Sequence, residues 1–152
     1  MKGYSRIIFV GQTGSSRAPM AAGILNDFTL ERQVEILARG MVVLFPEPIN
    51  QKAEAVLISN GINPEGYTCV QLCQEDITSE TLILVMEQAQ REKILQQFEN
   101  VTEDNVQELT ELVGDELDIV NPYGGTLAVY GLCYETLRKS IKKLVKLMNE
   151  GE

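Results

Sequence analysis

The sequence predicts an α/β protein with a four-stranded parallel sheet covered by helices on both faces, in three layers. Short apolar runs alternate with loops and with segments of helical spacing, which is the pattern of strand-helix-strand units. The run at residues 82–86 is continuously apolar, as expected for a central strand buried on both faces. The chain has 152 residues, of which 44% are hydrophobic, so it is long enough to bury one core. We therefore expect a single domain over residues 1–152.

Each element has a local justification in the sequence. Strands are predicted at residues 7–10, 34–38 and 82–86, and the segment 106–113 is predicted to hold the last strand. The spacing of residues 106–113 also suits a helical turn. The predicted helices are about 17–28, 50–61, 88–98 and 129–148. Asn50 is a residue type that caps helix N-termini, and Gly61 is one that ends helices.

The last helix combines an apolar stripe with a basic face. Helical spacing puts eight residues on the predicted buried stripe: Val129, Leu132, Cys133, Leu137, Ile141, Leu144, Val145 and Met148. The opposite face carries Arg138, Lys139, Lys142, Lys143 and Lys146. Cations are favourable near a helix C-terminus, so we interpret this face as a solvated surface and not as a membrane-binding one.

Charge and composition exclude several functions. The net charge of −9 would repel a nucleic-acid backbone or an anionic membrane, so we expect neither as a partner. The sequence has no histidine, which excludes Ser-His and Cys-His nucleophile pairs and histidine metal ligands. Cys69, Cys73 and Cys133 are too few and too badly spaced for a zinc site. Cys69 and Cys73 form either a redox pair or, as we prefer, two small buried residues. We expect no metal, no cofactor and, because there is no signal peptide or membrane-spanning stretch, a cytoplasmic location.

A glycine-rich turn after the first predicted strand has the composition of an anion site. In open α/β sheets, ligands bind beyond the carboxyl ends of the strands. Gly14 permits a left-handed backbone that turns N–H groups toward one point, and the start of the next helix adds a partial positive charge there. Arg17 supplies a guanidinium that can hold two phosphate oxygens. The predicted phosphate-binding residues are Gln12, Thr13, Gly14, Ser15, Ser16 and Arg17. The spacing differs from that of the nucleotide P-loop.

The string from Gly11 to Ala21, together with "ILARG", "INQKAEAVLISNGI", "LILVME" and "DIVNPYGG", resembles the low-molecular-weight protein tyrosine phosphatases in order and over nearly the whole chain. The resemblance implies the fold of that family. It also implies three catalytic positions, and each of them is altered. Gly11 stands where the family has its cysteine nucleophile, Ala18 where a hydroxyl steadies the thiolate, and Asn121 where an aspartate protonates the leaving group.

The binding half of the family's site is retained. Arg17 and the loop amides remain, and Tyr123 matches the residue that walls the family's aromatic pocket. The resemblance therefore implies a catalytically impaired phosphatase that binds phosphate, sulfate or a phosphotyrosine-bearing protein. Ser15 and Ser16 have no histidine to activate them, and Asp118, three residues before Asn121, is a candidate substitute acid.

Three alternatives remain open. The first is a phosphatase with residual activity. The second is an FMN-binding flavodoxin-like protein, because "QTGSS" at residues 12–16 is also similar to the flavodoxin phosphate loop. The third is an interaction module that uses the fold without any ligand.

Overall fold

The computed structural model describes residues 3–115 and 118–150. The expectation of one domain covers residues 1–152, of which 1–2, 116–117 and 151–152 lie outside the described residues. The strands are β1 (Arg6–Gly11), β2 (Glu35–Gly40), β3 (Thr81–Val85) and β4 (Val106–Glu108). The helices are α1 (Arg17–Asn26), α2 (Gln51–Ser59), α3 (Gln88–Gln97), α4 (Leu109–Val113) and α5 (Leu127–Glu150), with a short 3-10 helix, η1 (Gln74–Asp76).

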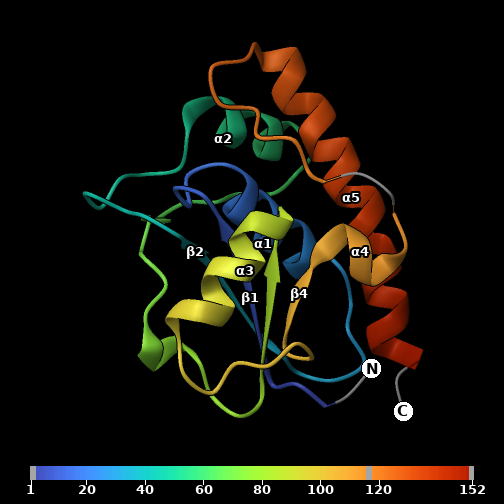
Figure 1. Cartoon of the computed structure of the whole chain (residues 1–152). Coiled ribbons are helices and arrows are strands. Elements are labelled where there is room, and N and C mark those ends of the chain that lie inside the picture. Colours follow the sequence, from blue (N-terminus) through green and yellow to red (C-terminus); the bar gives the residue numbers. More distant parts are fainter. Residues whose placement is uncertain (1–2, 116–117, 151–152) are drawn as a thin grey trace.

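The four strands form one parallel sheet in the order β2-β1-β3-β4, which confirms the predicted fold class (Figure 1). Alternate residues of β1 enter two different cores, as the two-residue period of a strand requires. Ile7 and Phe9 face the core that contains α1, α2 and α5, whereas Ile8 and Val10 face the core that contains Ile94 of α3. The sheet is therefore the middle layer of three. Its two central strands, β1 and β3, end beside each other at the candidate site.

The segment at residues 106–113 is half strand and half helix. The last strand lies in this segment, as predicted, but it takes only the first three residues, since β4 ends at Glu108 and Leu109–Val113 form α4. Both readings of the spacing were partly right, because only three residues pair with β3 before the chain turns into a helix.

The cap of α2 is as predicted, because the Asn50 side chain accepts hydrogen bonds from the amides of Lys52 and Ala53. The predicted stripe of α5 was wrong at its N-terminal end, where Val129 is 38% and Leu132 is 68% exposed. The buried stripe begins with Tyr130 and continues through Cys133 and Tyr134, so Val129 and Leu132 lie outside the face that packs against the core. The five basic residues opposite the stripe are exposed, as predicted.

The prediction that Cys73 is buried was wrong, whereas Cys69 and Cys133 are buried and all three thiols are free. The segment of Cys73 lies at the surface, where its amide donates to the Asp76 carboxylate. No helix in the described part of the chain combines the length and the apolar character needed to cross a bilayer.

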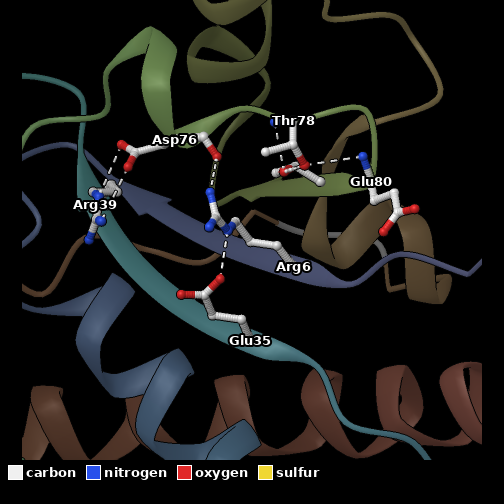
Figure 2. A network of polar contacts seen from close by, with 7 residues as sticks. Arg6, Glu35, Arg39, Asp76, Thr78 and Glu80 are labelled. Carbon is white, nitrogen blue, oxygen red and sulfur yellow. Dashed lines mark hydrogen bonds and ion pairs between the residues drawn. The ribbon is translucent and has the colours of Figure 1, made fainter.

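A polar network fixes the edge of the sheet beside η1 (Figure 2). Arg39 of β2 binds both carboxylate oxygens of Asp76, at 3.1 and 3.2 Å, and Arg6 of β1 donates to the Asp76 carbonyl at 2.8 Å. Arg6 also pairs with Glu35 at 2.8 Å. Arginine binds carboxylates through two parallel hydrogen bonds with good geometric specificity. The network therefore ties β1 and β2 to η1.

Candidate functional site

The candidate site is the loop between β1 and α1. β1 ends at Gly11 and α1 begins at Arg17, so residues 12–16 form a connection at the carboxyl edge of the sheet. Gly14 has φ +75°, the left-handed conformation predicted for it. A Cβ atom on Gly40 would lie 2.6 Å from the carbonyl carbon of Thr13, so the end of β2 packs directly against this loop.

The loop turns its carbonyl groups outward. Each of four loop carbonyl oxygens accepts a hydrogen bond from a residue outside the loop: Gly11 from Met41 N (2.9 Å), Gln12 from Val42 N (3.0 Å), Gly14 from Tyr67 Oη (2.6 Å) and Cys69 Sγ (3.3 Å), and Ser15 from Asn50 N (2.9 Å). A trans peptide unit presents its N–H on the side opposite its carbonyl. The N–H groups that follow these carbonyls therefore face away from the surrounding protein. In the described residues, the amides of residues 13–16 make no hydrogen bond.

Arg17 is buried, with 2% of its surface exposed. Its Nη1 donates to Glu87 Oε2 and to the carbonyl of Ile119, both at 2.7 Å. Its Nη2 is buried and has no hydrogen-bond partner in the described part of the protein. Buried polar groups are almost always paired, so an unpaired guanidinium nitrogen needs an explanation.

A small cavity lies inside the loop. Its walls are formed by Gly11, Gln12, Thr13, Gly14, Ser16, Arg17 and Asn121, and its volume is about 10 Å³. A cavity of about that size holds a single water molecule. Of the predicted binding residues, only Ser15 does not line it, because its hydroxyl pairs with Thr13 (2.8 Å) and its carbonyl with Asn50. Tyr123 also lies outside the lining, with 79% of its surface exposed.

The three positions that the resemblance marks as catalytic lie together around this cavity. Gly11 and Asn121 line it, and Ala18 lies beside Gly11. A Cβ atom on Gly11 would meet Ala18 N at 3.5 Å and Ala18 Cβ at 3.7 Å, which are ordinary van der Waals distances. The site therefore has room for a side chain at Gly11. The Asn121 side chain accepts a hydrogen bond from the amide of Tyr123 at 3.2 Å, which fixes the turn that carries it.

Asp118 interacts with Glu108 at the end of β4. Glu108 is only 4% exposed, and burial together with the adjacent Asp118 carboxyl raises its pKa to about 7. Gln88 Nε2 donates to one oxygen of Glu108 at 2.8 Å, while the other oxygen is buried and has no donor among the residues that the structure describes. Asp118 does not line the loop cavity. The structure therefore gives no support to Asp118 as a substitute acid.

Sequence reasoning missed the residues that support the loop. Glu87 and Ile119 hold Arg17, although they lie 70 and 102 residues away in the chain. A local signal existed for Glu87, because it follows the third strand directly and so lies at the same edge of the sheet as the loop. Tyr67 and Cys69 gave no signal of this kind. No cluster of three metal-ligating side chains occurs within residues 3–115 and 118–150.

Fold and site together define a three-layer α/β protein with a glycine-containing loop and a buried arginine at the end of its first strand. The chain belongs to the low molecular weight phosphotyrosine protein phosphatase family, whose model matches residues 6–152.

Among its relatives is the protein-arginine-phosphatase of Geobacillus stearothermophilus, with 31% identity over 147 residues, covering 95% of this chain and 97% of the relative. The low molecular weight protein-tyrosine-phosphatase PtpB of Staphylococcus haemolyticus is 26% identical over 139 residues, or 91% of this chain and 96% of the relative. Among solved structures, the low molecular weight protein tyrosine phosphatase of T. tengcongensis has a TM-score of 0.87 and 30% identity, covering 93% of this chain and 97% of that one.

Proposed function

We propose that this chain is a catalytically impaired member of the phosphatase family that binds a phosphate or sulfate group, free or on a protein side chain, at residues 11–17. The observation that carries the proposal is the buried Arg17, whose Nη2 has no partner in the described residues and which lines a cavity beside unpaired loop amides. Preorganised N–H groups and a guanidinium are the donors that bind phosphate oxygens.

Impairment follows from the three altered positions. Gly11 has no side chain, so no thiolate can attack phosphorus and form a covalent intermediate. The Asn121 amide cannot give a proton to a leaving oxygen, a step that typically contributes about 10²- to 10⁴-fold to the rate. Arg17 and the loop can still hold the phosphate oxygens, because neither interaction needs the missing groups.

The small cavity requires a movement on binding. A phosphoryl group is larger than the single water molecule for which the cavity has room. Asn121 is exposed, and within the described residues its side chain makes one hydrogen bond, to the amide of Tyr123 in its own turn. We therefore expect the turn at Asn121 to move outward, while Arg17 and the loop, which are held by many partners, stay in place.

A phosphoprotein ligand is supported by exposed apolar side chains on two segments next to the loop. One segment follows β2 and is joined to the loop by the hydrogen bond from Val42 N to the Gln12 carbonyl. The other contains Asn121. Their exposed side chains are Val42, Leu44, Phe45, Val120 and Tyr123. Exposed apolar side chains gathered around a polar site are typical of protein-binding surfaces. Tyr123, which does not line the cavity, is proposed to contact the ligand beyond its phosphate.

Phosphotyrosine is the phosphorylated residue that the family description indicates, and phosphoarginine is the second candidate, because a relative is named a protein-arginine-phosphatase. A cytoplasmic location fits a ligand of either kind. The FMN alternative has less support, because the sheet of the described residues has four strands, whereas the flavodoxin order has five.

The test combines thermal unfolding with an activity assay. A ligand that binds only the folded state raises the melting temperature, and inorganic phosphate at ten times its Kd should raise it by about 3–6 °C. Arg17→Met should lose this shift. Arg6→Met removes a partly buried guanidinium that does not line the cavity, so this variant should keep the rise in melting temperature. The absence of a saturable shift in the unmodified protein would contradict binding, and turnover of an aryl phosphate that depends on Arg17 would contradict impairment.

A further inference from the structure

Tyr67 and Cys69 both donate hydrogen bonds to the same loop carbonyl, that of Gly14. The Tyr67 hydroxyl lies 2.6 Å from this oxygen and the Cys69 thiol 3.3 Å from it. The two donors lie in the segment between α2 and η1, more than 50 residues after Gly14 in the sequence. No other carbonyl of the loop receives side-chain donors in the described residues.

The segment that carries the two donors is itself held in place. The Cys69 amide donates to the carbonyl of Glu47 at 2.7 Å, and the Tyr67 amide donates to that of Pro64 at 3.1 Å. Gly40, at the end of β2, makes two hydrogen bonds with the same segment. Its amide donates to the carbonyl of Val70 (3.0 Å), and its carbonyl accepts from the amide of Leu72 (2.9 Å). The donors therefore sit on a backbone that has little freedom to move.

Both groups remain donors at neutral pH. Burial is the main cause that raises the pKa of the Tyr67 hydroxyl, so it stays protonated. Burial, followed by the nearby Glu47 carboxylate, also raises the pKa of the Cys69 thiol. A protonated hydroxyl and a protonated thiol can each donate to a carbonyl oxygen.

The Gly14 carbonyl controls the direction of the next amide. Gly14 has a left-handed backbone conformation. Its peptide bond with Ser15 is planar and trans, so the Gly14 carbonyl and the Ser15 N–H point in opposite directions. With the carbonyl held toward Tyr67 and Cys69, the Ser15 N–H must face the opposite way. Without these donors the peptide can rotate and turn its carbonyl, instead of its N–H, toward an anion.

We infer that Tyr67 and Cys69 are positioning residues of the phosphate loop, which hold the Gly14–Ser15 peptide with its N–H directed toward the bound oxyanion. This inference rests on the proposed oxyanion-binding function. Tyr67 and Cys69 lie outside the loop and do not line its cavity, but they should increase its affinity for phosphate.

The test compares Tyr67→Phe with Tyr4→Phe, measured by calorimetric titration with inorganic phosphate. Both tyrosines are partly buried against the same core and each donates to one backbone carbonyl, but Tyr4 donates to Asp104, at 3.4 Å, remote from the loop. We expect Tyr67→Phe to weaken phosphate binding about 3- to 10-fold, the range for one lost hydrogen bond. Tyr4→Phe should bind as the unmodified protein does. Cys69→Ala should weaken binding less, and Cys69→Ser, which keeps a donor, should restore it.

Amide residual dipolar couplings report the direction of each N–H bond and do not need the ligand. In ligand-free Tyr67→Phe, the coupling of the Ser15 N–H should change, because the Gly14–Ser15 peptide is no longer held in one direction, while the couplings of β3 should be unchanged. If the unmodified protein binds phosphate but Tyr67→Phe binds equally well, the inference is wrong and the proposed function stands. If the unmodified protein does not bind phosphate, the proposed function is wrong. An unchanged N–H dipolar coupling of Ser15 in Tyr67→Phe overturns the inference in either case.

Discussion

Restoring the three altered positions should create a phosphatase. The variant is Gly11→Cys with Ala18→Ser and Asn121→Asp. A Cβ atom on Gly11 would lie no closer than 3.5 Å to its neighbours, so a cysteine needs no backbone shift. The same atom would lie 3.7 Å from Ala18 Cβ, which places a serine hydroxyl there within reach of the new sulfur. Asn121 accepts from the Tyr123 amide, and an aspartate oxygen can accept the same hydrogen bond, so the turn keeps its shape.

The three substitutions should affect the rate of hydrolysis by different amounts. Gly11→Cys alone should give slow turnover, because a thiolate beside an unpaired guanidinium nitrogen and a helix N-terminus has a lowered pKa and is a nucleophile. Adding Asn121→Asp supplies the general acid and should raise kcat about 10²- to 10⁴-fold further. The unmodified protein should have no turnover above background.

The assay is hydrolysis of an aryl phosphate at saturating substrate. The matched control carries Gly11→Ala in place of Gly11→Cys and keeps the other two changes, so that it differs only by the sulfur. The reasoning is refuted if the restored variant is folded and binds phosphate but hydrolyses no faster than this control. That result would mean that the loop does not direct position 11 at phosphorus.

Three further changes test the supporting structure. Gly40→Ala would place a Cβ atom 2.6 Å from the carbonyl carbon of Thr13 in the loop. It should therefore lower the free energy of unfolding by about 1–3 kcal/mol, measured by urea unfolding. The control Gly131→Ala, whose Cβ would meet no neighbouring atom within 4 Å, should not destabilise the fold. Glu87→Ala leaves the buried guanidinium of the loop without its carboxylate and should cost about 3 kcal/mol by the same measurement; a loss below about 0.5 kcal/mol would contradict the importance of the pair. The raised pKa of Glu108, about 7 against an ordinary 4.5, means that the folded state binds its proton more tightly than the unfolded state. This contribution is complete below pH 4.5 and is lost as the pH rises through 7, so stability should fall over that range, by at most about 1.4 kcal/mol per pH unit. Glu108→Gln should flatten this slope relative to Glu111→Gln, and an equal slope in the two variants would contradict it.

Much of the fold could be predicted because its signals are local. The continuous apolar run of β3 and the glycine-rich turn after β1 each predict one element and its place in a parallel sheet. The end of the sheet was harder, since β4 has three residues and α4 five, and neither is long enough to repeat its pattern twice. The start of the buried stripe of α5 was misassigned for another reason. Tyr130 and Tyr134 take the buried positions there, and spacing alone did not favour them over Val129 and Leu132.

The loop was predicted and its supports were not. The position of Gly14 and Arg17 between a strand and a helix carries the information needed to expect an anion site. The contacts of Arg17 with Glu87 and Ile119, and of Gly14 with Tyr67, join residues 53 to 102 positions apart. Such contacts depend on the assembled tertiary structure, which no short pattern in one sequence encodes.

The most direct test of the central claim is a calorimetric titration of the unmodified protein with inorganic phosphate. Saturable binding of one phosphate per chain, lost in Arg17→Met and kept in Arg6→Met, is the predicted result. The account is contradicted if no heat of binding is found at phosphate concentrations of tens of millimolar, or if Arg17→Met binds phosphate as well as the unmodified protein does.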